Sequence, residues 1–199
     1  TCPFRNNGFS VDTSLIQQSI CSDLVSNFSH INSSHDQLIT ELLDTGVFNR
    51  ILSRINELTG FPHLIWSCVL SATCPDDIKD AYYWHYDNHY NDWTPKVMIY
   101  LNSQDNFCGA TEFISYSNSN AISLQSDYMG LVPQRKPFQY KIQELVSKLS
   151  TSFCQSNSAL YCFSPKTAGS AIWFYPSRVL HRGVPPIHGI RYVLTFSLT

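Results

Sequence analysis

The chain has 199 residues, enough for one domain with a substantial core, and 43% of them are hydrophobic, which argues against a disordered chain. The net charge of −2 and the lack of any long run of Lys or Arg argue against a nucleic-acid partner. Length and composition together predict a single domain over residues 1–199. No apolar stretch approaches the length that spans a bilayer, so we expect no membrane span.

Helical spacing of apolar residues runs through the first 60 residues. One face carries Leu15, Ile16, Ile20, Leu24 and Val25, and the pattern continues from Leu38 to Ile55. Gly60, followed by Pro62, is a typical helix stop. We therefore expect residues 1–60 to form a helical N-terminal support.

Short runs rich in β-branched and aromatic residues follow and predict a mainly β core over residues 61–199. The predicted strands are 63–72, 81–85, 96–102, 111–115, 170–175 and 191–198. An insertion, 116–165, interrupts them. Its polar first part, 116–135, reads as a long loop, with Gln125, Gln134 and Arg135 as candidates for a lid or for a solvated surface, and an amphipathic helix runs from Phe138 to Leu149.

The seven cysteines include no CxxC pair, so a zinc site made of thiolates has little support. An odd number of cysteines also cannot all pair in one chain. We expect a reducing, cytoplasmic setting.

The triplet His85-Tyr86-Asp87 lies at the end of a predicted strand. Side chains alternate along a strand, so residues 85 and 87 share one face and can reach the same metal ion. A His and an Asp whose polar atoms are satisfied by backbone groups would give the same triplet, so it is weak support by itself.

His181 strengthens the metal interpretation because it follows the predicted strand 170–175. Two imidazoles and one carboxylate form the facial set that non-haem iron(II) oxygenases use, which leaves open positions on the metal. Arg191, ten residues further on, can grip a carboxylate with two parallel hydrogen bonds. Thr195 lies on the same strand face as Arg191.

These segments resemble the Fe(II)/2-oxoglutarate-dependent dioxygenase superfamily over residues 82–198. Tyr100-Leu101-Asn102 is similar to the family's YLN strand, and residues 106–113 are similar to its GGxTxF turn, with Cys108 where a Gly is usual. Residues 169–174 resemble its GxAxxF strand, and residues 181–191 resemble its HxG...GxR stretch. Thr111-Glu112-Phe113 looks prolyl-hydroxylase-like, whereas the long insertion looks phytanoyl-CoA-hydroxylase-like, so the branch stays open.

The resemblance implies a double-stranded β-helix, the cupin-like jelly roll, with N-terminal helices packed on its sheet. It implies that His85, Asp87 and His181 hold Fe(II), and that 2-oxoglutarate contacts Arg191, Tyr100 and Thr195. Dioxygen would be the second cosubstrate. Related halogenases replace the carboxylate ligand by Ala or Gly, so a carboxylate at this position favours hydroxylation of an unactivated C–H bond, with release of succinate and CO2.

Aromatic residues near the triplet are candidates for substrate contact, because aromatic faces hold planar or apolar groups. Tyr90, Trp93 and Trp173 are the predicted contacts, although strands are rich in aromatic residues for packing reasons alone. We expect a small-molecule substrate rather than a protein.

Two other functions are compatible with this sequence. A non-catalytic β-helix domain that binds a metal or a ligand would not bind 2-oxoglutarate. A cupin-type enzyme that chelates its substrate directly would not need Arg191. The presence of His85, Asp87, His181 and Arg191 together favours the oxygenase.

Overall fold

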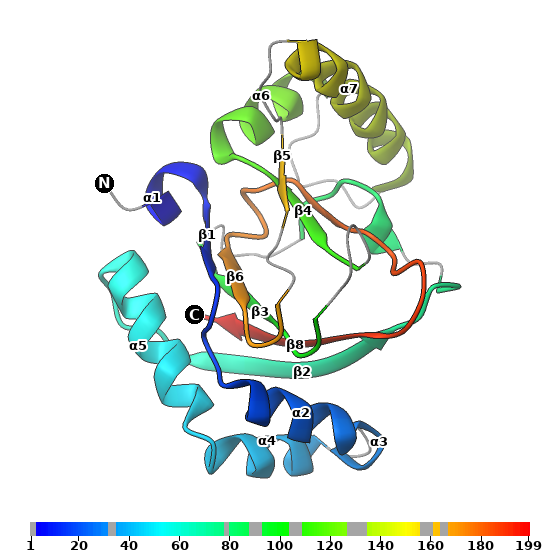
Figure 1. The fold of residues 1–199 in the computed structure, drawn as a ribbon. Coiled ribbons are helices and arrows are strands. Elements are labelled where there is room, and N and C mark those ends of the chain that lie inside the picture. Colours follow the sequence, from blue (N-terminus) through cyan, green and yellow to red (C-terminus); the bar gives the residue numbers. More distant parts are fainter. Residues whose placement is uncertain are drawn as a thin grey trace.

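The structure is a computed structural model. It consists of two antiparallel sheets with helices outside both of them (Figure 1). It describes residues 3–31, 35–77, 80–87, 93–103, 109–126, 135–155, 161–163 and 167–199. Helices α2 to α5 lie beside the larger sheet, and α6 and α7 lie beyond the smaller one (Figure 1). The prediction of a mainly β fold with flanking helices is confirmed.

The N-terminal helices come before β2 (Ile65–Thr73) in the chain, and all of them except the first cover the outer face of the larger sheet (Figure 1). They are α1 (Pro3–Asn7), α2 (Gln18–Ser26), α3 (Phe28–Ile31), α4 (His35–Leu43) and α5 (Val47–Thr59). Helix α5 buries Val47, Ile51, Ile55 and Leu58, which recur every three or four residues. It ends at Gly60, whose φ of 77° is left-handed and whose N–H donates to the carbonyl of Asn56 at 2.7 Å, so the predicted stop is confirmed.

The larger sheet has the strand order β1-β6-β3-β8-β2. Its strands are β1 (Phe9–Asp12), β2 (Ile65–Thr73), β3 (Lys96–Tyr100), β6 (Ala171–Phe174) and β8 (Arg191–Leu198). β1 corrects the prediction that residues 1–60 are helical throughout. It is a short edge strand that pairs with β6, far away in the sequence, so local spacing gave no sign of it.

The smaller sheet has the order β5-β4-β7, with β4 (Thr111–Ile114) between β5 (Tyr161–Phe163) and β7 (His181–Gly183). β5 lies inside the predicted insertion 116–165, which is therefore not wholly outside the sheets. α7 (Arg135–Gln155) extends the predicted amphipathic helix at both ends.

The predicted loop 116–135 is wrong over its first half, where α6 (Tyr116–Ser126) is helical. Two of its serines are buried with their hydroxyls hydrogen-bonded. Ser119 Oγ accepts from the N–H of Leu180 at 2.9 Å, and Ser123 Oγ shares a 2.7 Å bond with the hydroxyl of Tyr86. Because polar side chains are satisfied inside the protein, the helix packs without an apolar stripe.

Alternation along the strands separates two cores. Val97 and Ile99 of β3 face the helices, whereas Met98 and Tyr100 face the space between the sheets. A third apolar cluster, under α6 and α7, contains Trp84 and Ile114. The inner space therefore receives side chains from both sheets.

An ion pair joins α5 to the larger sheet. Arg54 donates to both carboxylate oxygens of Asp12 on β1, at 2.8–3.2 Å, and this contact raises the pKa of the arginine. Trp173 of β6 donates its indole N–H to the same carboxylate at 2.7 Å. These contacts lie on the helix side of the sheet.

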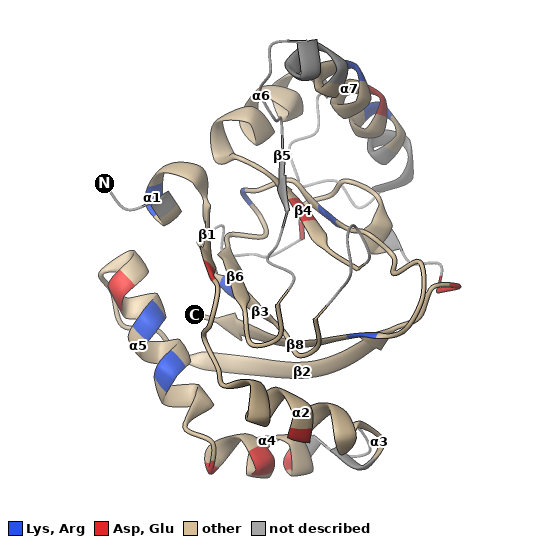
Figure 2. Ribbon diagram, in the orientation of Figure 1, with Lys and Arg blue, Asp and Glu red and all other residues tan. Residues whose placement is uncertain are grey.

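Basic and acidic residues are interspersed along α5 and α7 (Figure 2). Among the described helices, none is both long and apolar enough to cross a membrane. Cys21, Cys68 and Cys74 are free thiols.

Candidate metal centre

The HxD segment follows a short 3-10 helix, η1 (Asp80–Tyr82), and alternates like a strand. Trp84 and Tyr86 point outward into the cluster under α6 and α7. The hydroxyl of Tyr86 donates to the carbonyl of Ser119 at 2.9 Å. His85 and Asp87 consequently face the inner space, as the alternation predicts.

His181 meets this segment at the first residue of β7. The backbones of His85 and His181 exchange two hydrogen bonds, of 3.0 and 3.1 Å, and their rings lie 4.4 Å apart. Asp87 Oδ1 lies 3.4 Å from Nε2 of His85 and 3.6 Å from Nε2 of His181. One ligand atom from each of the three residues therefore lies within 4.8 Å of the others.

Both imidazoles are oriented by backbone carbonyls. Nδ1 of His85 lies 2.7 Å from the carbonyl of Tyr83, and Nδ1 of His181 lies 2.9 Å from that of Val179. Each carbonyl can only accept, so each Nδ1 carries the proton in the neutral ring and each Nε2 keeps a lone pair. Burial, reinforced by His85, lowers the pKa of His181, which keeps that ring neutral. This donor set suits iron(II).

Asp87 presents one oxygen to the imidazoles and the other to a cation. Lys96, the first residue of β3, pairs its ammonium with Oδ2 of Asp87. The backbone N–H of Asp87 donates to the carbonyl of Pro176 at 3.0 Å. These two contacts fix the carboxylate with Oδ1 toward the histidines. Sequence reasoning missed Lys96, because a Lys at a strand start carries no sign of its partner.

Arg191 is buried at the start of β8, with only 7% of its surface exposed. Its Nη1 donates to the carbonyl of Gly109 and, at 3.3 Å each, to those of Ala110 and Val184. Burial lowers the pKa of Arg191. Within the described part of the chain no carboxylate pairs with it, and Nε has no hydrogen-bond partner.

Tyr82 lies next to this guanidinium and was not predicted. Its hydroxyl is also buried without a partner, and burial raises its pKa. A Cβ placed on Gly183 would lie 3.4 Å from the Tyr82 ring and 3.6 Å from Nη2 of Arg191, so both side chains border that glycine. The Nε–H of the buried guanidinium and the hydroxyl of Tyr82, both without an acceptor, together form a cradle for an anion.

The other predicted cosubstrate residues line the same inner space. Tyr100 is almost completely buried and donates its hydroxyl to Oγ1 of Thr111 at 2.7 Å. Thr195 alternates with core-facing Leu194 and Phe196, so it shares a strand face with Arg191.

The three residues that were predicted to contact the substrate differ in where they lie. Tyr90 lies outside the described residues. Trp93 is 58% exposed and packs its ring against Tyr175. Trp173 is fully buried on the helix side of β6, where Asp12 binds it, so it does not face the inner space. The prediction for Trp173 is therefore wrong, because its strand position points away from the histidines.

No protein-family model matches this sequence, and neither does any curated protein sequence. Solved structures do match. HygX from Streptomyces hygroscopicus with iron bound is 13% identical, with a TM-score of 0.63, over 98% of this chain and 83% of that one. HygX has also been solved with nickel, 2-oxoglutarate and hygromycin B bound, at 14% identity and a TM-score of 0.61, over 98% and 84% of the two chains.

The epimerase SnoN, in complex with Fe3+, alpha ketoglutarate and nogalamycin RO, is 11% identical with a TM-score of 0.63, over 98% of this chain and 80% of that one. SnoN is described as a non-heme alpha ketoglutarate dependent epimerase from nogalamycin biosynthesis. A non-heme monooxygenase, ThoJ, matches in its nickel complex at 13% identity and a TM-score of 0.59, over 98% and 74%. This chain thus shares its fold with these enzymes, of which HygX and SnoN have been solved with a metal and 2-oxoglutarate (alpha ketoglutarate) bound.

Proposed function

We propose that this protein is an Fe(II)- and 2-oxoglutarate-dependent dioxygenase that hydroxylates an unactivated C–H bond of a small organic substrate, releasing succinate and CO2. The observation that carries the proposal is the convergence of three ligand atoms, from His85, Asp87 and His181, on one point of the inner space. Backbone carbonyls orient both rings before any metal binds, which favours a metal site over a chance cluster.

The cosubstrate assignment rests on the anion cradle at Arg191 and Tyr82. A buried guanidinium without an anionic partner is costly, and a bound carboxylate removes that cost. Three carbonyls hold Nη1, which leaves the other N–H groups of Arg191 to donate to a ligand. The distal carboxylate of 2-oxoglutarate would bind here, with its keto-acid end toward the metal.

Strand order supports a single jelly-roll domain. Each histidine ligand comes from the smaller-sheet side, whereas Arg191 and Tyr100 come from the larger sheet, so both sheets contribute to one inner site. We infer a double-stranded β-helix spanning residues 61–199 with the N-terminal segment packed on it.

When bound, iron(II) and 2-oxoglutarate would activate dioxygen, with the cosubstrate as the source of electrons. The protein's own contribution is to orient and to exclude water. Phe113 and Phe174 pack on the ring of His181, at 6.3 and 4.9 Å between centroids, and both are fully buried. This apolar wall shields one side of the metal position from solvent.

A small-molecule substrate is supported by the neighbours, since HygX and SnoN have been solved with hygromycin B and nogalamycin RO. Hydroxylation is our choice among reactions of this fold, because Asp87 completes the ligand set and leaves no place for a halide in its stead.

Anaerobic calorimetry tests the proposal in two steps. Fe(II) is titrated first and 2-oxoglutarate second. His181→Ala is expected to lose metal binding, whereas Arg191→Met is expected to keep the metal and lose 2-oxoglutarate. Unchanged 2-oxoglutarate binding in Arg191→Met would favour an enzyme that chelates its substrate directly, and no 2-oxoglutarate binding by the wild type would favour a non-catalytic domain.

A further inference from the structure

A cavity of about 350 Å³ lies outside the inner space. Four aromatic residues and two arginines line most of it: Phe61, Trp93, Tyr116, Tyr175, Arg5 and Arg178. They come from segments far apart in the sequence, including α1, the start of α6 and the connection from β6 to β7. The volume falls at the lower end of the range, roughly 300–1,000 Å³, that small-molecule sites occupy.

This cavity is separate from the candidate metal centre. Phe174 faces the inner space beside His181, but the next residue, Tyr175, packs on Phe4 at the helix side, with 4.6 Å between ring centroids. The cavity therefore lies at the end of β6, on the side of this strand that faces away from the candidate metal centre.

One wall offers an exposed aromatic face. The indole of Trp93 is 58% exposed and meets the ring of Tyr175 edge-on, at 5.5 Å and 83°. The guanidinium of Arg178 lies 4.5 Å from the centre of the Trp93 ring, which holds both groups in place. A flat ring is the ligand group that such a surface binds well.

The lining of the cavity also offers an oriented cation, Arg5. Nη2 of Arg5 donates to the carbonyl of Thr59, at the end of α5, at 2.6 Å. The absence of a side chain at Gly60 makes this possible, because a Cβ there would lie 2.6 Å from Nη2. None of the described lining residues is acidic. Arg5 thus keeps further N–H donors for an anion while a single backbone carbonyl fixes it.

We propose that this cavity is a binding site for a small organic anion that carries a planar ring, with the ring on Trp93 and the oxyanion on Arg5. Guanidinium groups bind carboxylates and phosphates alike, so the shared requirement is an oxyanion joined to a flat ring. The proposal concerns a site distinct from the metal and 2-oxoglutarate, and binding is expected without either.

The test measures equilibrium binding to the metal-free protein by calorimetry. Phenyl phosphate and benzoate are the probes, with inorganic phosphate and benzyl alcohol as the anion alone and the ring alone. At least one probe is expected to bind about tenfold or more tightly than either half. Arg5→Gln and Trp93→Ala are each expected to weaken binding of that probe about ten- to hundredfold, as loss of one charge-assisted or aromatic contact does.

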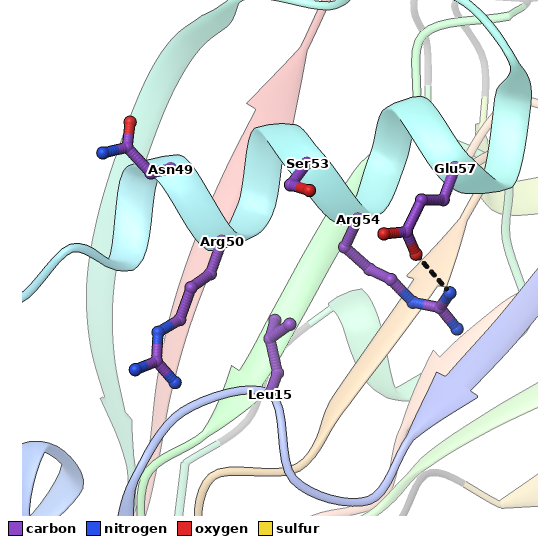
Figure 3. A pocket seen from close by; sticks show the side chains of 6 residues that line it. All are labelled: Leu15, Asn49, Arg50, Ser53, Arg54 and Glu57. Carbon is purple, nitrogen blue, oxygen red and sulfur yellow. Dashed lines mark hydrogen bonds and ion pairs between the residues drawn. The ribbon is translucent and has the colours of Figure 1, made fainter.

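Two controls separate this site from others. Arg50→Gln removes an exposed arginine from the shallow hollow on α5, where Arg50 points away from the Arg54–Glu57 pair, and should leave affinity unchanged (Figure 3). Arg191→Met removes the inner cation and should also leave affinity unchanged. The proposal would be overturned if inorganic phosphate or benzyl alcohol bound as tightly as the probes, or if both variants of the cavity residues kept wild-type affinity. Loss of probe binding in Arg191→Met would overturn it as well. Preference for phenyl phosphate or for benzoate identifies the oxyanion.

Discussion

At the scale of single residues, Lys96 is the side chain whose role the sequence did not reveal. It holds Oδ2 of Asp87, so that Oδ1 faces the two imidazoles. A lysine near a divalent ion also repels it, so orientation and charge act in opposite directions. Side chains that orient ligands typically change metal affinity 10- to 100-fold, which makes orientation the larger effect.

We therefore expect Lys96→Met to bind Fe(II) or Mn(II) roughly tenfold more weakly than the wild type. Lys96→Gln keeps a hydrogen bond to Oδ2 without the charge, and its affinity should stay close to that of the wild type. Competition with a chromophoric chelator measures both variants. Tighter metal binding by Lys96→Met would mean that charge repulsion dominates and that Lys96 does not orient the ligand.

Replacing Tyr82 should have opposite effects on the stability of the protein and on its affinity for 2-oxoglutarate. Its hydroxyl is buried without a partner, so Tyr82→Phe should stabilise the ligand-free protein by about 1 kcal/mol. The same substitution removes a donor to the proposed carboxylate, so 2-oxoglutarate affinity should fall roughly tenfold or more. Urea unfolding and anaerobic calorimetry measure the two effects. A destabilised variant with normal 2-oxoglutarate affinity would remove Tyr82 from the anion cradle.

Residue spacing accounts for part of the site. His85, Asp87 and His181 lie together because strand alternation and one backbone bridge place them so, and the alternation was readable in the sequence. Their role as ligands stays a prediction. Lys96 and Tyr82 were not readable, because their partners are set by packing between distant strands. The prediction that Trp173 contacts substrate failed because the spacing of residues along a strand does not say which face is the inner one. Its indole faces the helix side, where Asp12 accepts its N–H.

At the scale of elements, long periodic segments were predictable and short ones were not. α5 and β8 have enough residues to show a period, whereas β5 and β7 have three residues each and owe their structure to β4 between them. α6 escaped prediction because its buried polar groups are paired in three dimensions.

The entry into β6 depends on a glycine. Gly169 has a φ of 82°, and its carbonyl accepts the N–H groups of Leu15 and Ile16. A Cβ on Gly169 would lie 2.2 Å from the carbonyl oxygen of Ile16, a contact that requires backbone movement. The junction between the N-terminal segment and the larger sheet therefore tolerates no side chain there.

We expect Gly169→Ala to lower the free energy of unfolding by about 3–5 kcal/mol, from backbone strain and overpacking together. Gly189→Ala is the matched control, with a φ of 73° and no heavy atom within 4 Å of the added Cβ. It should cost only about 1–2 kcal/mol. Urea unfolding measures both, and equal losses would show that the contact with Ile16 relaxes freely.

At the scale of the whole molecule, the buried His181 couples stability to pH. Its pKa in the folded protein lies below the ordinary value, so as pH falls the unfolded chain takes up the proton first. The stability from the neutral ring is complete above the unfolded pKa, about 6.5, and is lost as pH falls through the folded pKa.

The melting temperature of the metal-free protein should therefore fall between pH 8 and pH 5 more steeply in the wild type than in His181→Gln. His63, whose pKa burial also lowers, contributes in the same direction and is tested separately with His63→Gln. Parallel pH profiles for the wild type and His181→Gln would contradict the assignment. Metal at a concentration one hundred times its dissociation constant should raise the free energy of unfolding by about 2.7 kcal/mol at pH 8.

Among the described residues, the reciprocal backbone hydrogen bonds between His85 and His181 form an isolated bridge that joins the HxD segment to β7. An ion bound there would act as a removable cross-link between two distant parts of the chain, closing a long loop much as a disulfide does. Amide hydrogens of residues 80–87 should then exchange with solvent more slowly when metal is present, while those of α5 are unaffected. Metal supply would in this way set the lifetime of the folded protein as well as its chemistry.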